Sequence, residues 1–129
     1  VVGTRGYIER IVDQINGTFE RGWFDACAVM IRRLVETVII EAFEHRGIDT
    51  KIKNAQGDFV PLSNMIDAAL AEPTWNLGRN TRRALPRIKG IGDRSAHSRR
   101  FVAHLRDIEK HIDDLREVVQ EFIFLAGLK

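Results

Sequence analysis

The sequence predicts an all-α protein, an up-and-down helical bundle of four to five helices with a loop-rich insertion at about residues 48–62. Apolar residues recur with helical spacing over three long segments, and each segment has one apolar stripe that a neighbouring helix must cover. Only the insertion lacks this periodicity, and it has room for a short hairpin. A chain of 129 residues supports one hydrophobic core, so we expect a single domain over residues 1–129. Because the chain begins at Val1 rather than Met, a fragment of a longer protein is an alternative.

The first two helices are predicted over residues 4–20 and 24–46. The apolar face of the first is formed by Ile8, Ile11, Val12, Ile15 and Phe19. Thr4 is expected to cap its start, and Gly47 is a typical residue just past the end of the second helix. The only cysteine, Cys27, lies in the second apolar stripe, where we expect a small buried residue without a disulfide.

The insertion reads as a turn at residues 54–58 between two short extended pieces, 51–53 and 59–60. A short helix is expected to follow, with Ser63 as its cap and Pro73 after its end.

The remaining helices are predicted over residues 80–89 and 99–126. Pro86 should distort the first of them or lie near its end, and Gly90 and Gly92 favour a turn between the two. The last helix carries a heptad pattern of apolar residues, which requires a neighbouring helix.

The charge of the chain is strongly uneven. Residues 79–106 hold nine of the 20 Lys and Arg residues but one acid, Asp93, which gives this window a charge of +8. The rest of the chain has 11 basic and 17 acidic residues and a charge of −6. Such a basic window indicates a polyanionic partner, either RNA or the acidic surface of a protein.

His97 is the strongest candidate for chemistry in this window. A histidine exchanges protons near neutral pH, and flanking cations such as Lys89 and Arg94 can stabilise a phosphate in a transition state. Asp93 is expected to cap the following turn, to orient His97, or to pair with Arg94. The alternative is that His97 only begins the last helix.

Other basic residues of the window would contact phosphates without reading a base sequence. These residues are Arg82, Arg83, Arg87, Arg99 and Arg100. Since no aromatic residue separates them, a base-stacking platform is not expected.

Arg32, Arg33 and Glu36 interrupt an otherwise apolar helix, either as an exposed ion pair or as a support for the His97 turn. No metal site and no cofactor are expected: His104 and His111 are seven residues apart, a rise of about 10 Å on a helix. Nucleotide-binding loops and common protease motifs are absent from the sequence.

Two segments, Cys27 to Glu36 and Ile88 to His97, resemble motifs of the HEPN superfamily, and most narrowly those of a prokaryotic HEPN-like domain family of unassigned function. The resemblance implies a helical bundle that forms a homodimer and, in catalytic members, a metal-independent endoribonuclease with its site at the dimer interface. The single cysteine predicts a cytoplasmic location. His97 matches the superfamily histidine, and Asp93 matches the polar position beside it.

Catalytic HEPN members place an arginine with four to six residues between it and the histidine. Those positions hold Gly92, Ile91 and Gly90 here, so Lys89 or Arg94 would have to supply the positive charge of the catalytic arginine. The function expected from the sequence is RNA binding, with endoribonuclease activity centred on His97. The alternative is a non-catalytic interaction or dimerisation module of a defence or toxin-antitoxin system. A partner of the nucleotidyltransferase type is a further expectation, and no membrane partner is expected.

Overall fold

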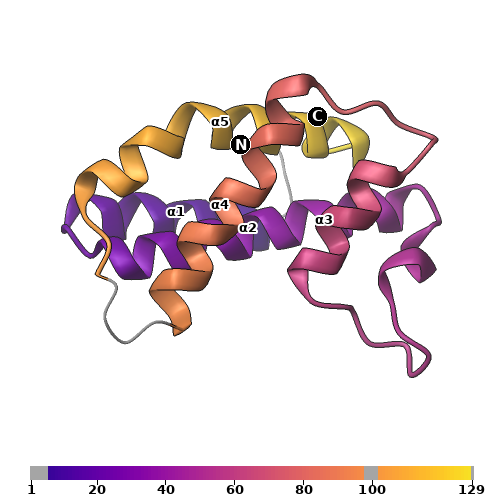
Figure 1. Ribbon diagram of the computed structural model, residues 1–129, viewed down its shortest axis with the longest axis horizontal. Helices are drawn as coiled ribbons and strands as arrows, with labels where there is room; N and C mark the ends of the chain where they lie inside the picture. The colour runs from indigo at the N-terminus through magenta and orange to yellow at the C-terminus, as the bar shows by residue number, and fades with distance from the viewer. Residues whose placement is uncertain (1–5, 98–101, 129) are drawn as a thin grey trace.

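The computed structural model describes residues 6–97 and 102–128, and of residues 96 and 97 it describes the backbone alone. Within these ranges the chain forms five α-helices packed as a bundle, one 3-10 turn and no strand (Figure 1). The helices are α1 (Gly6–Glu20), α2 (Phe24–His45), α3 (Leu62–Ala71), α4 (Arg79–His97) and α5 (Leu105–Leu125), and the 3-10 turn is Asp49–Ile52. The predicted all-α bundle is confirmed.

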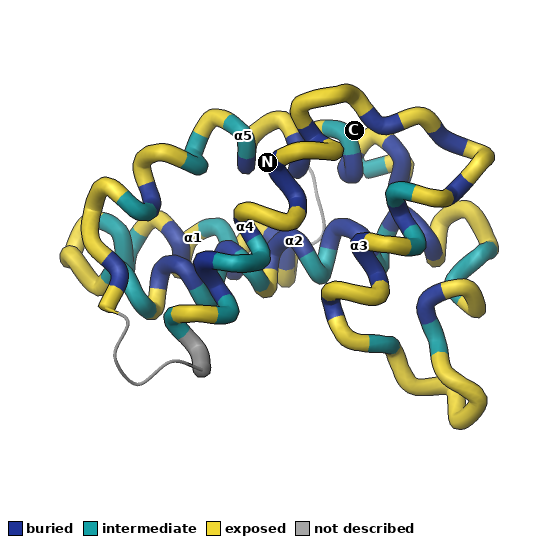
Figure 2. Tube along the Cα trace, viewed as in Figure 1, coloured by how far each residue is buried: buried dark blue, intermediate teal, exposed yellow. Residues whose placement is uncertain are grey.

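Helix α2 lies at the centre of the bundle, where it packs against α1, α4 and α5. Figure 2 shows buried positions recurring along α2 and exposed positions on the outer faces of the surrounding helices. Phe43 and Phe122 are fully buried, and Trp75 lies between them with ring centroids 4.9 Å and 6.2 Å away. The indole of Trp75 also donates to the carbonyl of Ala69 at 2.9 Å. These contacts join α2, α5 and the segment after α3 into one core.

Two expectations for α2 are confirmed. Gly47 follows its end with a φ of 69°, and the amide of Ile48 donates to the carbonyl of Phe43 at 3.0 Å. Cys27 is buried and free, and burial raises the pKa of its thiol.

The predicted turn at residues 54–58 is present. The amide of Asn54 donates to the carbonyl of Asp58 at 2.8 Å, and the Asn54 side chain accepts from two amides of the turn. Strand pairing in the insertion is limited to one bridge between Lys53 and Phe59, because Lys51 and Ile52 belong to the 3-10 turn. The prediction of an extended piece over 51–53 is therefore wrong for its first two residues.

Buried Glu72 ties this insertion to the segment after α3. Its carboxylate accepts from Nζ of Lys51 at 2.6 Å and from the amide and hydroxyl of Thr74. These hydrogen bonds lower the pKa of Glu72 to about 2, so the carboxylate remains charged at neutral pH.

The predicted cap of α3 is wrong. Pro61 precedes the helix, and its carbonyl accepts from the amides of Asn64 and Met65. Ser63 lies one residue inside the helix, and its hydroxyl donates to Asn64.

The glycine turn predicted before His97 is also wrong, because α4 continues through Gly90 and Gly92 to His97. A Cβ at position 92 would lie 2.5 Å from Cβ of Arg32 and 3.1 Å from the carbonyl oxygen of Ala28. Gly92 thus lets α4 approach α2 closely and does not mark a turn. Pro86 lies inside α4, and because proline has no amide hydrogen, the carbonyl of Arg82 lacks its helical donor. Both residues are exposed.

Helix α5 begins later than predicted. Residues 102–104 are not helical, and the His104 amide donates to the side chain of Asp107 at 2.8 Å at the start of the helix. The amide of Ala103 donates to the side chain of Asp25 at 2.9 Å, which fixes this segment against the first turn of α2. In the two described ranges, no helix combines the length and the apolar character that a membrane span requires.

Candidate nucleic-acid interface

The exposed face of α4 carries three arginines in register. Arg79, Arg83 and Arg87 are spaced by four residues, which places them on one side of the helix at steps of about 6 Å. All three are exposed, and within the described part of the chain none makes a hydrogen bond or an ion pair. We call these three residues the arginine row. Its spacing is similar to that between successive phosphates of a nucleic-acid strand.

Arg82, a predicted phosphate contact, is engaged by backbone carbonyls of the protein itself. Its guanidinium donates from Nε to the carbonyl of Leu77 at 3.2 Å and from Nη1 to the carbonyl of Leu70 at 3.1 Å. Arg82 therefore satisfies carbonyl groups at and beyond the end of α3. Of the predicted phosphate contacts, Arg83 and Arg87 belong to the arginine row, whereas Arg99 and Arg100 lie outside the described residues.

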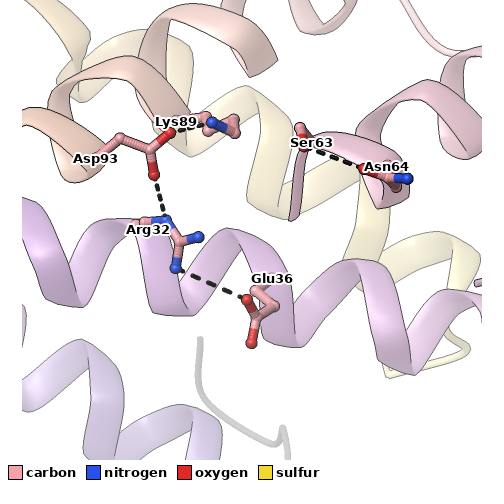
Figure 3. Close-up of polar contacts among 6 residues, drawn as sticks. All are labelled: Arg32, Glu36, Ser63, Asn64, Lys89 and Asp93. Atoms are coloured by element: carbon pink, nitrogen blue, oxygen red, sulfur yellow. Dashed lines mark hydrogen bonds and ion pairs between the residues drawn. The ribbon is translucent and has the colours of Figure 1, made fainter. Parts of the chain in front are cut away.

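Asp93 lies inside α4 and does not act as a cap. It accepts from Nε of Arg32 at 2.7 Å and from Nζ of Lys89, and Arg32 also approaches Glu36 at 3.9 Å (Figure 3). We call these four residues the Asp93 cluster. Partial burial alone would raise the pKa of Asp93, but the hydrogen bonds from Lys89 and Arg32 outweigh it and hold that pKa below its ordinary value.

The Asp93 cluster contains two cations and two carboxylates, so its formal charges balance. The ionised Asp93 is not suited to donate a proton at neutral pH, and Lys89 is engaged by it. The cluster therefore joins α2 to α4, and it contributes little net charge to the surface.

An open pocket of about 480 Å³ lies beside the Asp93 cluster, where α4 meets α2 and the start of α3. Its lining residues are Arg32, Pro61, Leu62, Ser63, Lys89, Asp93 and Arg94. The predicted residues Lys89, Asp93 and Arg94 are thus brought together. His97 is the last residue of α4, and its side chain lies outside the described part.

The three residues of α2 singled out from the sequence separate in the structure. Arg32 and Glu36 are half-buried and belong to the Asp93 cluster, whereas the turn that they were expected to support is part of α4. Arg33 is exposed and belongs to no hydrogen bond or ion pair of the described residues.

A second pocket, of about 510 Å³, lies between α4 and α5. We call it the α4–α5 pocket, and it is lined mainly by Arg87, Gly90, Arg94, Lys110, His111 and Asp114. Burial and the positive charge of Lys110 lower the pKa of His111, Asp114 opposes this, and Arg87 and Arg94 lower it further.

Sequence reasoning missed the α4–α5 pocket. One signal was present: Arg87 and Arg94 are seven residues apart, so they share a face of α4. The pairing of α4 with α5 was needed to place His111 opposite them. No group of three or more potential metal ligands occurs among residues 6–95 and 102–128.

Comparison of the chain with protein-family models, with curated proteins and with solved structures finds no match.

Proposed function

We propose that this helical bundle binds RNA through the arginine row on α4. The observation that carries the proposal is the regular spacing of three exposed arginines that have no partner among the described residues. An exposed guanidinium without a carboxylate partner keeps its full charge and its donors for an external anion. Three such groups along one helix face match a linear polyanion better than a single bound anion.

The expected binding mode is contact with the phosphate backbone. The exposed side chains of the row are flanked by Pro86 and Asn80, and no aromatic residue occurs between Arg79 and His97. Without aromatic rings the surface has no platform on which bases could stack, so affinity should depend weakly on base sequence. The resemblance to HEPN domains favours RNA over an acidic protein as the polyanion.

The affinity for a labelled single-stranded RNA should fall steeply as salt concentration rises. Each neutralised phosphate contributes a slope of about −0.7 to the plot of log affinity against log salt, so three contacts give a slope of about −2. Fluorescence anisotropy over a range of KCl concentrations measures this slope. A poly-glutamate peptide serves as the matched acidic competitor. Absence of RNA binding at low salt, a flat plot, or equal affinity for poly-glutamate would contradict the proposal, the last in favour of an acidic protein partner.

The catalytic part of the proposal rests on the resemblance alone and assigns His97 the proton transfer. Cleavage of RNA in the presence of EDTA is expected for the wild type and should fall by about 100-fold or more in His97→Ala, the range for a general acid–base residue. Product formation is followed on a gel with an end-labelled RNA. His45→Ala is the control, because His45 lies at the far end of α2. If cleavage persists in His97→Ala, or if the wild type does not cleave RNA, the catalytic assignment fails and the binding proposal stands.

A further inference from the structure

The α4–α5 pocket combines a concentration of positive charge with a half-buried histidine. Arg87 and Arg94 line it from α4, and Lys110, His111 and Asp114 line it from α5. With His111 neutral, the three cations and one carboxylate give the lining a formal charge of +2. Its volume of about 510 Å³ is in the range of small-ligand sites.

Nδ1 of His111 provides a second, independent observation. This atom is buried and has no hydrogen-bond partner among the described residues. Buried polar atoms are nearly always paired, because leaving one unpaired removes its hydrogen bonds to water without replacement. The pocket thus combines a positively charged lining with the imidazole of His111, whose Nδ1 has no hydrogen bond within the described residues.

We propose that the α4–α5 pocket binds a phosphate monoester, and that on RNA this group is the terminal phosphate. A monoester carries a charge of about −1.5 to −2 at neutral pH, which matches the lining, whereas an internal phosphodiester carries about half of that. Arg87 belongs both to the arginine row and to the pocket, so a strand that follows the row would place its end there. The assignment to RNA rests on the proposed function, whereas the preference for a monoester rests on the pocket.

Binding of a monoester should change the titration of His111. Burial and the charges of Lys110, Arg87 and Arg94 hold the pKa of His111 low against the opposing effect of Asp114. A bound dianion offsets those positive charges and favours the imidazolium, so the pKa should rise. This shift can be followed by NMR of the His111 ring, assigned by comparison with His111→Gln.

The test compares RNA oligomers of one sequence that carry a 5′-phosphate, a 3′-phosphate or hydroxyls at both ends. We expect one phosphorylated form to bind roughly tenfold or more tightly than the hydroxyl form, as charge-assisted hydrogen bonds imply. The ratio of these two affinities should fall to near one in Lys110→Gln. It should persist in the control Arg116→Gln, because Arg116 is exposed and does not line the pocket. Equal affinity of all three oligomers, or a ratio unchanged in Lys110→Gln, would overturn the assignment.

Inorganic phosphate and AMP separate this inference from the proposed function. If no RNA binds but either small phosphate raises the pKa of His111, the proposed function fails and the monoester pocket stands. If RNA binds without a preference for its ends and neither small phosphate changes that pKa, the pocket assignment fails and the proposed function stands.

Discussion

Replacing Arg79, Arg83 and Arg87 together by glutamate is expected to lower the affinity for RNA by at least about 100-fold at low salt. Each arginine is exposed and has no partner among the described residues, so its loss removes a phosphate contact without breaking an internal one. Three charged contacts at about 1 kcal/mol each correspond to a change in affinity of roughly two orders of magnitude. The new carboxylates also repel the phosphates. Anisotropy with one labelled RNA measures the change.

A matched variant tests whether position or net charge matters. Arg10, Arg33 and Arg116 are exposed on α1, α2 and α5, and their replacement by glutamate changes the net charge by the same amount. The account expects a much smaller loss of affinity for this variant. Similar losses in the two variants would mean that RNA responds to net charge alone and that the arginine row has no special role. Thermal melting checks that both variants are folded.

The second large effect is expected at Gly92. Gly92→Ala should lower the free energy of unfolding by about 1–2 kcal/mol, the balance of overpacking against the higher helix propensity of alanine. The added methyl would meet Cβ of Arg32 and the backbone of Ala28, which cannot move as the end of a flexible side chain can. Urea denaturation followed by circular dichroism measures the change.

Gly90→Ala is the control, with the opposite sign. A Cβ at position 90 would have the flexible end of Arg94 at 3.4 Å as its nearest contact, so the substitution should stabilise α4 by up to about 1 kcal/mol. If the two substitutions change stability equally, the close approach of α4 to α2 at Gly92 is not what selects glycine there. A loss of stability in Gly90→Ala larger than in Gly92→Ala would instead support a turn near Gly90.

Much of the fold could be predicted because the apolar spacing is local information. The second helix was predicted over 24–46 and ends one residue earlier, at His45. Gly47 stops this helix through its own positive φ. The error at Gly92 has a tertiary cause. Glycine is selected there by a helix 60 residues away, which local propensity cannot show.

The site could be predicted only in part. The sequence located the basic window, but it could not show which cations have internal partners. Arg82 and Lys89 have them, since Arg82 binds backbone carbonyls and Lys89 pairs with Asp93. The pairing of Arg32 with Asp93 joins residues 61 positions apart, so it depends on how α2 and α4 pack.

The most direct test of the account compares the salt dependence of RNA binding in the wild type and in a variant with glutamine at positions 79, 83 and 87. Glutamine removes the charge of the arginine row without adding repulsion. If the row supplies the phosphate contacts, the slope of log affinity against log salt should become shallower by about 2, since each contact contributes about 0.7. An unchanged slope in a folded variant would contradict the assignment of RNA binding to α4.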